Sequence, residues 1–177
     1  SALNKNTTGD FNVAVGSNAL CTNVTSDANT AVGYFSLKVN TAANNTAVGA
    51  DSLCANTTGE KLVAVGALAL DANTTADDNT AVGYCSLSTN TTGCRNVAMG
   101  CGSLKTNLTG DRNTALGHIA LEGNTSADNN TAIGYAALNV NRTGTQNVAV
   151  GANALAANTT GAENTAVGST ALVAHLT

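Results

Sequence analysis

A unit of 17 residues recurs ten times along this chain of 177 residues. The consensus of the unit is N-[TV]-A-V-G-x-x-[AS]-L-x-x-N-T-T-G-x-x, and its positions are numbered below from the first Asn. A supersecondary unit that repeats at a fixed period buries its apolar side chains by stacking on its neighbours. The sequence therefore predicts a solenoid. Residues 12–177 form a single repeat domain after a partial repeat at residues 1–11, with coils that start at residues 12, 29, 45, 62, 79, 96, 113, 130, 147 and 164.

The residue types favour strands and turns over helices. Pro and Trp are absent, only 3% of the residues are aromatic, and the unit carries no apolar stripe of helical period. A triangular hexapeptide β-helix is also disfavoured, because the unit lacks an aliphatic residue at every sixth position. We expect an all-β β-solenoid, a β-roll of about ten coils with two strands per coil. One strand covers the pentapeptide, the other surrounds the Leu of position nine, and Asn-Thr-Thr-Gly forms a turn.

The apolar positions of the unit predict its core. Position nine is Leu in all ten copies, and position four is Val, Met, Leu or Ile. Side chains alternate between the two faces of a strand, so we expect position four to point inward with the Leu of position nine. The predicted core residues are Val15, Leu20, Val32, Leu37, Val82, Leu87, Leu104, Leu121, Leu138 and Leu155.

Position three is Ala in all ten copies and would then lie on the opposite, outer face. A row of Ala and Gly permits close approach of another backbone, so we expect this face to pack against neighbouring chains. A smooth outer surface is the alternative explanation. The Asn residues of positions one and twelve can bond to backbone groups at turns and to the Asn of the next coil, forming ladders.

Position five is Gly in all ten copies and indicates a sharp corner, with φ above zero, at the end of the first strand. A side chain at this corner would be crowded. The predicted corner glycines are Gly16, Gly33, Gly49, Gly66, Gly83, Gly100, Gly117, Gly134, Gly151 and Gly168.

Several functions are disfavoured by the sequence. The net charge is −4 and the seven Lys and Arg residues are scattered, which argues against a nucleic-acid partner. No apolar run is long enough for membrane insertion. His118 and His175 occupy different repeat positions without a recurrent nucleophile, and the five Cys residues have no CxxC spacing. We therefore expect no enzymatic activity, no catalytic or metal-binding residues and no cofactor.

Two surface features suggest binding partners. Tyr34, Tyr84 and Tyr135 share position six, where exposed rings can stack on the apolar faces of sugars, although a purely structural role is the alternative. Asn-x-Ser/Thr sites recur at position twelve, but they are a by-product of the repeated Asn-Thr-Thr turn. We do not expect them to carry glycans.

The run Asn79-Thr80-Ala81-Val82-Gly83-Tyr84-Cys85-Ser86-Leu87 has relatives in every copy. It resembles the head repeats of YadA-like trimeric autotransporter adhesins. It is still more similar to the Asn-Thr-Ala-Val-Gly-Tyr repeats of phage and large-virus tail-fibre proteins. The resemblance implies a β-roll, three copies of which pack into a homotrimer that projects from a virion or a cell surface. The loops of the unit are longer than in the usual adhesin head repeat, and residues 1–177 contain no heptad stalk and no sequence expected to form a membrane anchor or a chaperone domain.

These observations lead to two functional hypotheses. The first is a structural or adhesive fibre segment that attaches to a host or cell surface through an unknown receptor or glycan, outside the cell or on a virion, with any targeting signals elsewhere. The second is an ice-binding solenoid, because Thr recurs at position two. Val interrupts that row at Val13, Val63, Val97 and Val148.

Overall fold

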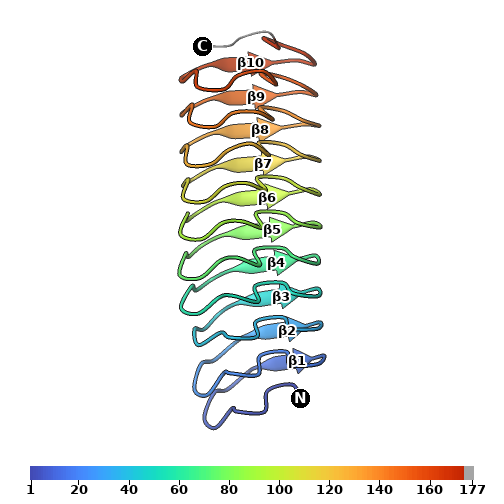
Figure 1. The fold of residues 1–177 in the computed structure, drawn as a ribbon, viewed down its shortest axis with the longest axis vertical. Coiled ribbons are helices and arrows are strands. Elements are labelled where there is room, and N and C mark those ends of the chain that lie inside the picture. Colours follow the sequence, from blue (N-terminus) through green and yellow to red (C-terminus); the bar gives the residue numbers. More distant parts are fainter. Residues whose placement is uncertain (174–177) are drawn as a thin grey trace.

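The computed structural model describes residues 1–173, which form a single tall stack of coils (Figure 1). Each coil contributes one strand of three residues to a parallel sheet in which the strands follow the order of the sequence. This arrangement confirms the all-β solenoid. The strands are β1 (Val13–Val15), β2 (Thr30–Val32), β3 (Thr46–Val48), β4 (Val63–Val65), β5 (Thr80–Val82), β6 (Val97–Met99), β7 (Thr114–Leu116), β8 (Thr131–Ile133), β9 (Val148–Val150) and β10 (Thr165–Val167).

The strands pair in the register that the repeat predicts. Ala81 of β5 lies opposite Ala98 of β6, and Val82 lies opposite Met99. The copies that start at residues 29 and 45 are 16 residues apart, one fewer than elsewhere, and their strands β2 and β3 still keep this register, with Ala31 opposite Ala47. Each position of the unit therefore meets its own copy in the next coil, at the strand separation of about 4.8 Å that parallel sheets share.

The second strand per coil was predicted wrongly. Within residues 1–173 each coil has one strand, and the segment around the Leu of position nine is a series of turns. The residues of positions seven, nine and seventeen adopt left-handed backbone conformations, for example Cys85 (φ 53°), Leu87 (φ 51°) and Arg95 (φ 60°). Extended pairing cannot pass through such residues, although single hydrogen bonds still join the coils, as from Leu87 N to Ser103 O (3.0 Å).

The core of each coil contains Leu and Ala. The Leu of position nine is fully buried in nine copies, and the Ala of position three is buried in every copy from Ala31 to Ala166. Leu172, in the last described coil, is 49% exposed. The leucine part of the predicted core lies where the sequence placed it: Leu20, Leu37, Leu87, Leu104, Leu121, Leu138 and Leu155, together with Leu53 and Leu70.

The valine part of the predicted core is wrong. Val15 is 58% exposed, and Val32 and Val82 are partly exposed, because positions two and four point outward while position three points inward. The interior is a narrow space between the strand and the turns that follow it. Leu fills that space, so only a small residue such as Ala fits on the facing strand and at position eight.

The corner glycines lie at the end of each strand, where the sequence placed them. All ten have φ between 127° and 140°, a conformation that side chains disfavour. A Cβ built on Gly83 would lie 2.7 Å from both the carbonyl carbon and the oxygen of Gly100 in the next coil. The invariant Gly is therefore required both by the corner and by the close approach of the coil above.

Two ladders of buried Asn side chains run along the stack. At position twelve, Asn107 donates to Asn90 Oδ1 (2.9 Å) and to Gly110 O (3.0 Å), and it accepts from Asn124 Nδ2 (2.7 Å). At position one, Asn79 Oδ1 accepts from the backbone N–H of Asn96 (2.8 Å). Asn at these positions satisfies polar groups that the turns leave inside the protein, so the ladders hold the turns in place.

The coil of residues 29–44 breaks the ladder of position twelve because it is one residue shorter. Asn40 Nδ2 donates to Ala42 O (2.6 Å) within its own coil instead of donating to Asn23. Asn23 Oδ1 is consequently buried without a hydrogen-bond partner. One missing residue thus interrupts the side-chain ladder while the strands remain in register.

Candidate functional site

The outward face of the sheet is a continuous surface that carries no charge. Every strand presents Thr or Val at position two and Val, Met, Leu or Ile at position four, and no strand residue is charged. Exposure is highest at the two ends, 58% at Val15 and 71% at Val167. Other strand residues of this surface that are prominently exposed are Val13, Val63, Val65, Met99 and Leu116.

The shape of this surface follows from the fold. Ten strands in register span about 43 Å at the usual spacing between strands, and each adds two outward side chains. Scattered apolar residues are normal on a protein surface, whereas a contiguous apolar patch of this length is typical of an interaction site. We call this surface the strand face.

The Ala row of position three was expected to face neighbouring chains, and this expectation is wrong. Ala81 and Ala98 have no exposed surface, and they belong to the cluster that packs around the leucines. The two faces of the strand are therefore exchanged relative to the sequence interpretation. Since the alternation of side chains is the same in both cases, only the packing of Leu87 and its equivalents on Ala decides which face is inside.

The three tyrosines of position six are about half exposed: 51% at Tyr34, 57% at Tyr84 and 54% at Tyr135. They lie three coils apart and do not form one aromatic platform. Tyr34 stacks on Phe35, with ring centroids 4.0 Å apart, and His118 stacks on Tyr135 at 5.8 Å. The side chain of the adjacent Cys85 raises the pKa of Tyr84, and the nearby Cys101 raises it further.

Groups that could carry out catalysis are dispersed over the described coils. Within residues 1–173, no three His, Cys, Asp or Glu side chains gather in a way that could hold a metal ion. All five cysteines are free. Burial raises the pKa of the Cys54 thiol, and the charge of Asp71 raises it further, which disfavours the reactive thiolate. His175 lies outside the described residues.

The Asn-x-Ser/Thr sites of position twelve lie inside the coils. These Asn side chains have no exposed surface and contribute to the ladder, so an attached glycan is incompatible with the folded rod. This burial was not evident from the sequence pattern. The fully buried members of the row are Asn23, Asn56, Asn73, Asn90, Asn107, Asn124, Asn141 and Asn158.

No protein-family model, curated protein or solved structure matches the chain. The described residues contain no helix that is long and apolar enough to cross a membrane. The most extensive surface feature of the described coils is the strand face, which runs along all ten strands.

Proposed function

We propose that this chain is a non-enzymatic segment of an attachment fibre, in which three parallel copies pack through their strand faces into a stiff rod. The observation that carries the proposal is the strand face itself. It is apolar at position four of every coil and uncharged throughout, and it extends along all ten strands.

Association would remove this apolar surface from water. The exposed fraction of the most exposed side chains at position four ranges from 36% at Val65 to 71% at Val167. Burial of apolar surface contributes about 25 cal/mol per Å², so many identical coils acting together can drive stable association although each contributes little. Because every coil presents the same two positions, neighbouring copies can align coil by coil.

The number of copies is proposed from the resemblance to trimeric fibre repeats. Closed threefold symmetry covers the strand face of each copy in the same way and leaves no such face free for further growth. The turns on the other sides of the coil stay exposed and vary from copy to copy. A rod with a uniformly uncharged inner surface and variable turns is suited to projecting from a virion or cell and contacting another surface.

Sedimentation equilibrium tests the assembly. We expect three times the monomer mass for the native chain at micromolar concentration. Val82→Glu combined with Met99→Glu places two carboxylates on register partners of the strand face and should yield a folded monomer. Thr92→Glu with Thr109→Glu is the matched control, because both residues are exposed turn positions of the same two coils. A native chain that remains monomeric contradicts the proposal, and binding of the assembled rod to a glycan array tests attachment.

Ice binding is the second candidate function, and one observation favours it. Thr80, Thr114 and Thr131 point outward from the sheet, and their hydroxyls make no hydrogen bond within the described residues. Hydroxyls at the regular spacing of strands can match a lattice of water. Val at four of the ten positions interrupts the row, which makes this the weaker candidate. Thermal hysteresis of the native chain, absent in a Thr80→Lys variant, would support ice binding over the fibre.

A further inference from the structure

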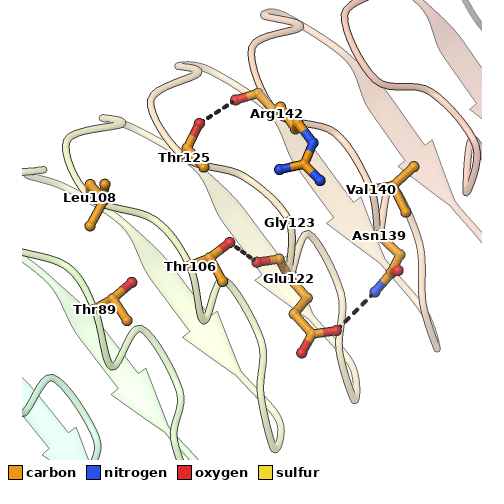
Figure 2. Close-up of a pocket in the computed structure, with 9 residues that line it drawn as sticks. All are labelled: Thr89, Thr106, Leu108, Glu122, Gly123, Thr125, Asn139, Val140 and Arg142. Atoms are coloured by element: carbon orange, nitrogen blue, oxygen red, sulfur yellow. Dashed lines mark hydrogen bonds between the residues drawn. The ribbon is translucent and has the colours of Figure 1, made fainter.

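A groove of about 520 Å³ crosses four consecutive coils on the side of the turns (Figure 2). None of its residues belongs to a strand, so packing through the strand face does not use them. They occupy positions ten, eleven and thirteen of the unit. The lining residues are Thr89, Thr106, Leu108, Glu122, Gly123, Thr125, Asn139, Val140 and Arg142.

The groove includes Gly123, which interrupts the row of side chains at position eleven. Position eleven is Thr, Val or Ala in the other full coils, and Gly123 is its one residue without a side chain. The backbone is also closer to the next coil here: Gly123 N lies 2.7 Å from Asn139 O, whereas Thr106 N lies 3.1 Å from Glu122 O. A Cβ on Gly123 would lie 2.7 Å from Asn139 O, so this local geometry requires Gly.

One wall of the groove accepts hydrogen bonds. The hydroxyl of Thr106 donates its proton to Glu122 O (2.5 Å), and that of Thr89 donates to Lys105 O (2.7 Å), which leaves their oxygen lone pairs as acceptors. The Glu122 carboxylate is held by Asn139 Nδ2 (3.3 Å). Ligand hydroxyl groups are the neutral donors that such a wall would bind.

The other wall donates hydrogen bonds. In Figure 2 the Arg142 guanidinium points back toward Gly123. Within the described coils this guanidinium makes no side-chain hydrogen bond and no ion pair, so its N–H groups are available to an anion. Arg binds a planar carboxylate through two parallel hydrogen bonds. Leu108 and Val140, 46% and 39% exposed, add apolar surface beside it.

We propose that this groove binds a sugar acid, a saccharide whose carboxylate pairs with Arg142 while its hydroxyls donate to Glu122 and the threonines. The C–H groups of the ring would contact Leu108 and Val140. In part this rests on the attachment function proposed above, since a fibre needs a ligand on the surface that it contacts. The groove itself lies within one chain and does not require the trimer.

Other ligand classes match the groove less well. A phosphate dianion carries more negative charge than a carboxylate and would be repelled more strongly by Glu122, and an uncharged sugar would make no ion pair with Arg142. A free amino acid could bridge Glu122 and Arg142. It is small for a groove of about 520 Å³, a volume within the range of sites for larger ligands.

Isothermal titration with glucuronic acid, galacturonic acid, glucose and glycine tests the proposal. We expect the two acids to bind the native chain, and glucose, which lacks the carboxylate, to bind at least about tenfold more weakly, the factor of a lost charged hydrogen bond. Glycine keeps a carboxylate but lacks the sugar ring and its hydroxyls, so it should also bind more weakly than the acids. Arg142→Gln should reduce acid binding by a similar factor. Arg95→Gln, which removes the same charge from an exposed turn residue outside the groove, should have no effect.

Gly123→Thr introduces the residue that three other coils carry at position eleven, and its Cβ, which would lie 2.7 Å from Asn139 O, should disturb the groove and abolish binding. Circular dichroism establishes that each variant is folded. Equal binding of glucose and glucuronic acid, preferential binding of glycine, or unchanged binding by Arg142→Gln overturns the proposal. The absence of any binding of the acids up to about 10 mM also overturns it. Sedimentation of the same samples reports separately on the trimer, so failure of one proposal is distinguishable from failure of the other.

Discussion

The strand and the turns of each coil are stabilised in different ways. The strand segment, positions one to five, pairs with its neighbours through a regular parallel ladder and presents its larger side chains to the outside. The turn segment, positions six to seventeen, has no strand and places Leu and Asn inside the coil. Both segments stack at the same spacing, yet they depend on different interactions.

The turn segment requires side chains that offset its backbone strain. Three residues per coil, such as Cys85, Leu87 and Arg95, have positive φ, and each left-handed residue costs about 1 kcal/mol. Burial of Leu and the hydrogen bonds of the Asn ladder oppose this cost. We therefore expect the stability of a coil to depend mainly on its turn segment, whereas the strand segment presents the surface that we propose for association.

Substitutions in the core of the turn segment should reduce stability more than substitutions on the strand face. Leu104→Ala should lower the free energy of unfolding by about 2–5 kcal/mol, because it leaves a cavity in the core. Met99→Ala, in the strand of the same coil, should cost the isolated chain less than about 1 kcal/mol because Met99 is 39% exposed. Urea denaturation followed by circular dichroism measures both. Equal costs at low protein concentration would contradict the division between the two segments.

A second pair of variants compares an intact with a broken part of the Asn ladder. Asn107→Ala leaves Asn90 Oδ1 without a partner and removes one of the two hydrogen bonds made by each of Asn124 Nδ2 and Gly110 O, so it should cost about 2–4 kcal/mol. Asn23→Ala removes the bonds to Asn6 and Ser26, while Asn23 Oδ1 has no partner in the native chain. We expect its cost to be lower by about 1 kcal/mol. Urea midpoints of the two variants provide the check, and a larger cost at Asn23 would exclude the ladder as the source of stability.

The smallest of the three effects concerns two glycines near the boundary between the segments, Gly83 at the end of a strand segment and Gly102 at the beginning of a turn segment. Gly83→Ala forces a Cβ to within 2.7 Å of the Gly100 carbonyl and should cost about 1–3 kcal/mol. Gly102→Asn is the control, because Asn18 and Asn153 occupy the same position of other coils with φ of 55° and 57°. It should change stability by less than about 0.5 kcal/mol. Thermal unfolding of both variants tests the contrast, which disappears if position five tolerates Ala.

Much of the fold could be predicted from the repeat. A fixed period, invariant Leu and Gly, and residues typical of strands and turns indicated stacked coils, and the sheet order and register confirm that stacking. The conformation of Gly83 and its equivalents could also be predicted, because Gly in every copy indicates a backbone conformation that a side chain would disturb. The sequence pattern did not exclude a second strand around the Leu of position nine. Leu rarely adopts positive φ, so the turn that the structure shows there could not be anticipated.

The proposed binding surfaces were harder to predict from the sequence. The strand face was assigned to the core because alternation within a strand does not specify which face is inside. The groove was missed as well, although one signal was present: Gly123 is the one Gly in a row of Thr, Val and Ala. Its neighbours Glu122 and Arg142 come from adjacent coils, 20 residues apart in the chain, and only the stacking brings both to one groove.

The sequence by itself determined the period of the coils, their register and the position of the corners, because identical residues in every copy must meet across the stack. The tertiary structure alone decided that Ala81 faces inward and Val82 outward. The physical reason is volume: the space between the strand and the turns holds one Leu per coil, and beside Leu87 there is room for Ala but not for Val. A pattern of apolar residues specifies two faces, and the packing of the turn segment selects the buried one.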